Sequence, residues 1–264
     1  MNIGRYQANF DRLCGNLTAY AEANCPPAHG DDGQRAARAK TLSESLFLAH
    51  STAGAKFALI CRDQGLKGFH GRVEVQMGTE DCVFFYLSPF RRPNTSCGFL
   101  FSRNLEISRR GDGAASPFDS GSLVEHCVRP DQTQSLRDFL AVHELPIPDH
   151  RHYLSLCMRS LFGDPADYVN GIHPQFPGPI GLTGGDHRRW THEVRIKGQV
   201  SLKDGHLQAV FASRARAASD PNIRSVFEWY LTAGVDRILF DNPGEEDFEA
   251  LKRECLEYIG RKIY

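Results

Sequence analysis

The stretch THEVRIK at residues 191–197 decides how the rest of this sequence is interpreted, because charged and apolar residues alternate along it. A period of two predicts a β-strand, with Val194 and Ile196 on one face and Glu193 on the other. Glutamate does not favour strand formation. Taken alone, the pattern indicates an edge strand whose charged face is exposed to water.

The composition limits the class of protein. The chain has 264 residues, of which 41% are hydrophobic, and its formal net charge is -1. These values are typical of a folded protein with one large domain or two small ones. A nearly neutral chain lacks the global positive field of many nucleic-acid-binding proteins. An anionic partner would therefore have to be bound by local clusters of arginine.

Cysteine usage and hydropathy indicate where the protein is expected to act. The eight cysteines form no CxxC pair and no framework of short spacings, which predicts reduced thiols. The histidines at 150, 152, 187 and 192 have no accompanying cysteine pair, so no bound metal is expected. The chain contains no apolar run of membrane-spanning length, and its start lacks the residue order of a signal peptide. We therefore expect a cytoplasmic protein that does not enter the membrane.

Hydrophobic periodicity predicts the elements of the first half of the chain. Apolar residues at intervals of three and four predict an amphipathic helix over 5–23. Prolines and glycines predict a flexible linker over 25–38, and the folded body is expected to begin near residue 41. The next elements are expected to be a strand at 45–49, a helix that ends at Gly65, and strands at 71–77, 82–87 and 97–102.

The second half is expected to be helical at first and to return to strands later. Prolines and glycine pairs with little periodicity predict a long loop over 164–187. The helices are expected near 122–128, 133–144, 149–162, 221–233 and 246–261. The strands are expected at 189–197, 206–212 and 236–241.

The first motif with chemical meaning is His50-Ser51-Thr52, which is followed by the expected helix and then by Gly65-Leu66. A histidine at the end of a buried strand is commonly a structural residue. The order of strand, His-Ser-Thr, helix and Gly-Leu nevertheless resembles the opening of the ADP-ribosyltransferase fold, in which His-Gly-Thr and Gly-Leu hold NAD. The resemblance implies that His50, Ser51 and Thr52 bind this cosubstrate. Ser51 replaces the usual glycine and would slightly narrow access to the backbone.

The second motif is FFYLSPFRR at residues 84–92, an aromatic strand that runs into a proline and two arginines. By itself it fits a core strand followed by an exposed basic turn. It resembles the Phe-Tyr-Phe-x-Pro-Arg segment of DarT-type toxins, a branch of the same superfamily that modifies DNA bases. The resemblance implies that Tyr86 lines the nicotinamide pocket and that Arg91 or Arg92 contributes to catalysis. The additional Phe90 leaves both arginines as candidates.

The third motif is Glu193, which is similar to the glutamate on the final strand of this superfamily. In those enzymes the carboxylate bonds to the nicotinamide ribose and stabilises a transition state that resembles an oxocarbenium ion. A fixed anion lowers the free energy of the positive charge that develops when nicotinamide leaves. The match implies that Glu193 is catalytic. Thr191 stands where relatives that modify arginine carry Glu or Gln, which argues against an arginine acceptor.

The loop before this strand is where enzymes of this kind recognise the acceptor. The resemblance therefore implies substrate-binding roles for Arg188, Arg189, Trp190 and Thr191. Arginines beside an aromatic ring suit a phosphate backbone with an unstacked base. These side chains slightly favour nucleic acid, DNA or RNA, over protein as the acceptor. The alternative is a crossover loop without an acceptor role, which Trp190 anchors to the core.

The resemblance covers residues 45–105 and 186–212 and implies an α+β fold, with an ADP-ribosyltransferase-like split antiparallel sheet core and surrounding helices. This domain is expected over 41–264 with a helical insertion at about 106–185, after an N-terminal helix and flexible linker at 1–40. The implied reaction transfers ADP-ribose from NAD to a macromolecular acceptor and releases nicotinamide, in a toxin or defence role. An NAD glycohydrolase without such an acceptor and an inactive binding module remain alternatives. A cognate antitoxin remains open as a further partner.

Overall fold

The protein folds as a mixture of helices and mainly antiparallel strands, which confirms the expected α+β class. None of the described helices is long and apolar enough to cross a membrane. The computed structural model describes residues 3–25, 31–87, 97–122, 136–172, 191–240, 253–255, 257–258 and 261. Two compact units are present, a first unit of residues 1–46, 68–89 and 106–198, and a second unit of residues 47–67, 90–105 and 199–264.

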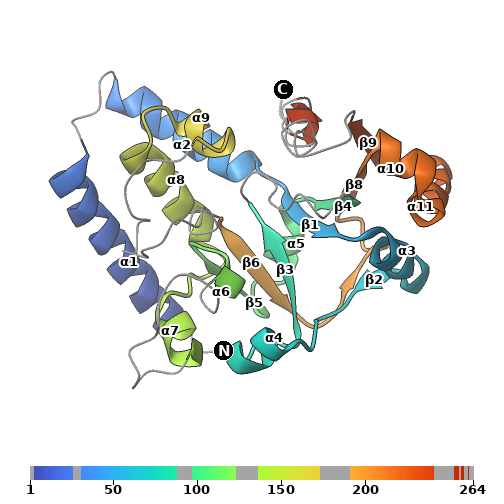
Figure 1. The fold of residues 1–264 in the computed structure, drawn as a ribbon. Coiled ribbons are helices and arrows are strands. Elements are labelled where there is room, and N and C mark those ends of the chain that lie inside the picture. The colour runs from blue at the N-terminus through green and yellow to red at the C-terminus, as the bar shows by residue number, and fades with distance from the viewer. Residues whose placement is uncertain are drawn as a thin grey trace. The chain divides into compact units, whose positions relative to one another are not determined.

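The first unit contains three antiparallel strands in the order β5, β6, β3, so β6 lies in the middle (Figure 1). Val194 and Ile196 on β6 are buried, as the alternation predicts. The edge-strand interpretation is wrong, because β6 has a hydrogen-bonded neighbour on each side. The strands are β3 (Cys82–Tyr86), β5 (Gly113–Ser116) and β6 (Glu193–Lys197).

Three long helices support this unit. The N-terminal helix α1 (Ile3–Asn24) and the second helix α2 (Asp32–Ser45) both pack against α8 (His150–Leu161) (Figure 1). Leu13 and Leu17 of α1 are fully buried. The helices predicted over 5–23 and 149–162 are therefore confirmed.

Helix α2 corrects the flexible linker expected over 25–38. Asp31 caps the helix, because its side chain accepts a hydrogen bond from the backbone N–H of Gly33 at 2.8 Å. Ala39 and Ser43 are buried, on a helix that packs against α8. Asp32 and Gly33 are therefore the first residues of a helix and not part of a linker. Residues 26–30 lie outside the described part of the chain.

Helix α4 (Arg72–Met77) replaces the strand expected over 71–77. Val73 and Met77, four residues apart, pack with Phe118, whereas Val75 is 46% exposed. The buried residues therefore follow the spacing of a helix and not the alternation expected for a strand. Gly78, at φ 71°, ends the helix in the left-handed conformation that glycine adopts without strain.

The expected loop over 164–187 is wrong for its first residues, which form α9 (Pro165–Val169). The side chain of Asp164 accepts a bond from the N–H of Ala166, and Asp167 bonds back to the N–H of Asp164. Residues 173–187 lie outside the described part, as does 123–128 of the helix expected near 122–128. The shorter helices are α5 (Asn104–Ser108), α6 (Ser120–Ser122) and α7 (Leu136–Val142), the last within the helix expected at 133–144.

The second unit contains the strand order β1, β4, β8, β9, antiparallel except for the last pair. Helices α10 and α11 connect β8 to β9, and α3 lies between β1 and a small antiparallel pair formed by β2 and β7. Its elements are β1 (Leu48–Thr52), α3 (Gly54–Asp63), β2 (Gly65–Leu66), β4 (Cys97–Phe101), β7 (Val200–Ser201), β8 (Leu207–Ser213), α10 (Arg214–Ser219), α11 (Pro221–Ala233) and β9 (Asp236–Phe240).

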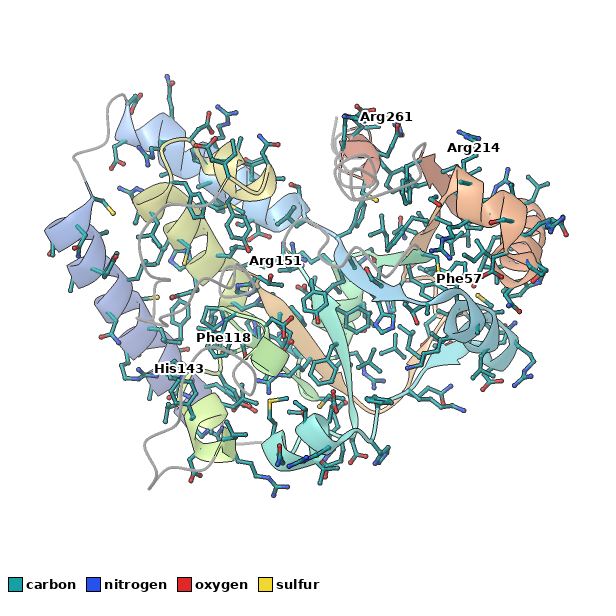
Figure 2. All side chains as sticks on the ribbon, in the orientation of Figure 1. Phe57, Phe118, His143, Arg151, Arg214 and Arg261 are labelled. Carbon is teal, nitrogen blue, oxygen red and sulfur yellow. The ribbon has the colours of Figure 1, made fainter. Side chains whose placement is uncertain are left out.

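Most of the expected elements of this unit are confirmed, namely the strands at 97–102, 206–212 and 236–241 and the helix at 221–233. The first strand begins at Leu48 and not at residue 45, because α2 extends to Ser45. The described residues of the expected closing helix at 246–261 are helical. Phe57, labelled in Figure 2, anchors α3 to the sheet with its ring centroid 4.8 Å from that of Phe99.

Gly98 of β4 lies too close to its neighbours to carry a side chain. A Cβ atom there would lie 2.3 Å from the carbonyl oxygen of His50 and 2.4 Å from the ring of Phe211. We expect Gly98→Ala to lower the free energy of unfolding by about 1–3 kcal/mol, because packed neighbours must move. Urea unfolding followed by circular dichroism measures the change. Gly111→Ala, where a Cβ meets nothing within 4 Å, is the control, and an equal effect at both positions would contradict the packing argument.

Candidate functional site

One face of the first unit's sheet carries the polar residues, and we call it the polar face. Directly paired residues of antiparallel strands share a face. Glu193 is paired with Tyr86 of β3 and with Ser116 of β5, and Arg195 is paired with Phe84. Glu193 and Arg195 are thus buried on the middle strand, whereas Lys197 at the end of the alternation is exposed.

Glu193 is completely buried on this face, at 0% exposure. The backbone N–H of Ser120, the first residue of α6, donates a hydrogen bond to its Oε2 atom at 3.2 Å. The other carboxyl oxygen, Oε1, has no hydrogen-bond partner within the part of the chain that the structure describes. Residues 120–122 thus form a short helical turn whose first N–H contacts the candidate catalytic group.

Arg195 lies beside this carboxyl group and is also buried. Its Nη2 atom donates to the hydroxyl of Ser116 and to Oε1 of Glu144, both at 3.2 Å. Its Nε atom lies 3.8 Å from Oε1 of Glu193. That distance allows electrostatic attraction but is too long for a hydrogen bond. Both atoms are therefore buried with no hydrogen-bond partner in the described ranges.

The surroundings of Glu193 favour its neutral form. Burial is the main cause, and the negative charge of Asp119 adds to it, so that together they raise the pKa of Glu193 to about 8. Arg195 and the hydrogen bond from Ser120 oppose this change. Glu193 is therefore mostly protonated at neutral pH in this arrangement.

This pKa makes stability depend on pH in a defined direction. The unfolded chain ionises Glu193 near 4.5, but the folded protein holds the proton to about pH 8. The stabilising contribution is complete below pH 4.5 and is lost as pH rises to 8, at about 1.4 kcal/mol per pH unit or less. We expect urea unfolding between pH 5 and 8 to show wild type losing stability relative to Glu193→Gln, which cannot ionise. A constant difference across this range would contradict the prediction.

A second buried group of polar residues, the buried quartet of Glu106, His150, Arg151 and His192, lies in the same unit. Arg151, labelled in Figure 2, donates from Nε and Nη2 to the two oxygens of Glu106, both at 2.8 Å. Nε2 of His150 is 3.2 Å from Glu106 Oε2, and Nδ1 of His150 is 2.9 Å from Nε2 of His192. Arg151 also donates to the carbonyl oxygen of Ser43 at 2.7 Å, near the end of α2.

The electrostatics of the quartet keep its charge on the Glu106–Arg151 pair. Burial alone would raise the pKa of Glu106, but Arg151 and His150 outweigh it and hold that pKa well below its ordinary value. Burial is the main cause that lowers the pKa of His192 well below its ordinary value, and the positive charge of Arg151 adds to it. A neutral His192 that donates to His150, and a His150 that donates to Glu106, satisfy these atoms. The quartet thus fixes the residue directly before Glu193.

Three of the candidate cofactor residues lie in the second unit. His50, Ser51 and Thr52 form the end of β1, and α3 and the Gly65-Leu66 strand follow in the predicted order. His50 is half-buried, with its ring centroid 6.5 Å from that of Phe99. Helix α3 does not end at Gly65, as expected, but at Asp63, with Gln64 in the left-handed conformation.

The other candidates divide between the first unit and residues outside the described part. Tyr86 and Glu193 are brought together as cross-strand partners. Thr191 is buried, and its hydroxyl has no hydrogen-bond partner among the residues described. Residues 88–96 and 173–190, with the candidates Arg91, Arg92, Arg188, Arg189 and Trp190, lie outside the described residues.

The sequence did not predict that Arg195, Glu144 and Asp119 surround Glu193. It also did not predict the contacts within the buried quartet. Within the described part, no group of three or more side chains suited to a metal ion is found. No model of a known protein family matches the chain, and no curated protein matches it. The function must therefore be argued from the residues themselves.

Proposed function

We propose that this protein transfers ADP-ribose from NAD to a macromolecular acceptor and releases nicotinamide, with Glu193 as the catalytic residue. The observation that carries the proposal is the buried carboxyl group of Glu193 on the middle strand of its unit, opposite Tyr86. Its Oε1 atom has no hydrogen-bond partner among the residues that the structure describes. Buried ionisable groups with shifted pKa values are common at active sites. An unsatisfied oxygen is available to accept a hydrogen bond from a ribose hydroxyl.

The order of elements in the second unit supports the same proposal independently. A strand that ends in His50-Ser51-Thr52, one helix and a Gly-Leu strand are the parts that the sequence resemblance requires. In the proposed enzyme, His50 binds the ribose or amide of NAD, with Ser51 and Thr52 beside it. Arg91 or Arg92 holds charge near the phosphates or the reacting centre.

The proposed reaction is a substitution at C1 of the nicotinamide ribose. The bond between C1 of the ribose and the nicotinamide nitrogen breaks, and the electron pair leaves with nicotinamide. An acceptor atom then bonds to C1 and loses its proton. The ionised form of Glu193 stabilises the positive charge that develops on the ribose, and the ring of Tyr86 packs against nicotinamide. Thr191, Arg188, Arg189 and Trp190 contact the acceptor in this proposal.

The test is the fate of NAD labelled in its adenylate part. Purified protein is incubated with the label and, separately, with single-stranded DNA, duplex DNA, RNA and a protein lysate, and nicotinamide release is measured in each. Transfer of label to one acceptor class, with matching nicotinamide release, supports the proposal. Formation of free ADP-ribose at a rate that no acceptor changes identifies an NAD glycohydrolase. Absence of nicotinamide release in every mixture contradicts the proposal and leaves a binding module.

A further inference from the structure

We propose that Arg195 is a two-position switch that sets the charge of Glu193. In the observed position its guanidinium group is bonded to Glu144 and Ser116. In the second position its Nε–H donates to Oε1 of Glu193, which then carries a negative charge. The role is that of a positioning residue, since Arg195 acts through the carboxyl group of Glu193.

The inference begins with two unsatisfied atoms that face each other. Nε of Arg195 and Oε1 of Glu193 are both buried, have no hydrogen-bond partner among the described residues and lie 3.8 Å apart. Burying a polar atom without a partner costs free energy, so native proteins rarely leave two such atoms adjacent. A displacement of about 1 Å would bring them to hydrogen-bond distance and satisfy both.

Glu144 is the group that holds Arg195 in the observed position. Its Oε1 accepts from Arg195, and its Oε2 pairs with Arg5, so Glu144 connects Arg195 to α1. A pocket of about 340 Å³ borders both Glu144 and Arg195. The contact between Glu144 and Arg195 is therefore not enclosed on all sides by packed side chains.

The charged groups around Glu193 act in opposite directions. Asp119, just before α6, raises the pKa of Glu193, and Arg195 on β6 lowers it. Cys82 of β3 also faces this group, and burial raises the pKa of its thiol, so it adds no negative charge at neutral pH. Arg195 is the cation whose charge lowers the pKa of Glu193 most. Its distance from the carboxyl group therefore controls ionisation.

The switch would explain how Glu193 becomes ionised in the proposed reaction. Glu193 is needed as an anion, yet its resting surroundings favour the neutral acid. A shift of Arg195 from Glu144 to Glu193 would ionise the carboxyl group at neutral pH without a large rearrangement. This consequence rests on the proposed function, whereas the switch itself is a property of the side chains.

The test is a titration of the Glu193 carboxyl carbon by NMR in protein labelled at glutamate, with Glu193→Gln to assign the signal. We expect Glu144→Gln to release Arg195 and lower the pKa of Glu193 by about one unit or more. In an Arg195→Met background, Glu144→Gln should have no effect, because the shift acts through Arg195. Arg5→Gln is the matched control, since it leaves Glu144 charged and should not lower this pKa.

Two results would overturn the switch. One is an unchanged titration in Glu144→Gln, and the other is an equal shift with and without Arg195. If Arg195→Met fails to fold, the Nε–H proton signal of Arg195 in Glu144→Gln replaces it. A downfield movement, as expected for a bond to a carboxylate, supports the switch, and an unmoved signal overturns it. The expected titration together with absence of NAD cleavage would leave the switch standing and contradict the proposed function instead.

Discussion

Replacing Glu193 with glutamine is expected to slow nicotinamide release from NAD by about 10²- to 10³-fold. The amide has nearly the same shape as the carboxyl group but cannot become an anion, so it loses the charge that stabilises the transition state. Glu193 holds its proton to about pH 8 in the folded protein, so glutamine also resembles its resting form. We therefore expect the variant to fold normally and to be at least as stable as wild type at neutral pH.

The control is Glu228→Gln, which removes an exposed glutamate from α11 in the other unit. It makes the same chemical change without touching the polar face, and its rate should equal that of wild type. Initial rates of nicotinamide release at saturating NAD measure the effect in the three proteins. If Glu193→Gln releases nicotinamide as fast as Glu228→Gln, Glu193 is not the catalytic residue.

Local periodicity predicts several elements of the fold, including β6, the strand that carries Glu193. The alternation at 191–197 predicts β6 and the buried side of Val194 and Ile196, and helices α8 and α11 follow from their regular spacing. The order of β1, α3 and β2 is also readable, because each is a short run bounded by recognisable signals. These features depend on residues close together in the chain, which is what sequence patterns record.

The strand beside β6 could not be predicted in the same way. Gly113 to Ser116 contains only small residues, without the β-branched or aromatic side chains that indicate a strand. Because β5 was not foreseen, β6 was expected at an edge with its charges in water. The buried positions of Glu193 and Arg195 follow from β5 and from the α6 turn, and neither has a periodic signal.

The polar contacts of the site were hidden for a different reason. Glu106, Arg151 and His192 come from three elements far apart in the sequence, and charged residues of these types are ordinarily exposed. Only the packing of α8 and the start of β6 brings them together. A sequence pattern shows which face a residue occupies within one element but not which residue from another element it meets.

Arg151→Met is expected to lower the free energy of unfolding by about 3–5 kcal/mol, the second large effect. The change removes both hydrogen bonds from Arg151 to Glu106 and leaves a buried carboxylate with the contact to His150. It also leaves the carbonyl oxygen of Ser43 without the guanidinium donor. Methionine fills most of the volume, so the loss comes from electrostatics and hydrogen bonding rather than from a cavity. Urea unfolding at pH 7 measures it.

Arg159→Met is the matched control, because Arg159 lies on the same helix and also pairs with a carboxylate, Asp32. That pair is exposed, and exposed ion pairs contribute about 0–1 kcal/mol. The double variant Glu106→Leu with Arg151→Met should cost less than the sum of the two single changes, since it removes the buried charge together with its partner. If Arg151→Met costs no more than Arg159→Met, the quartet does not stabilise this unit, and His192 must be held before Glu193 by packing alone.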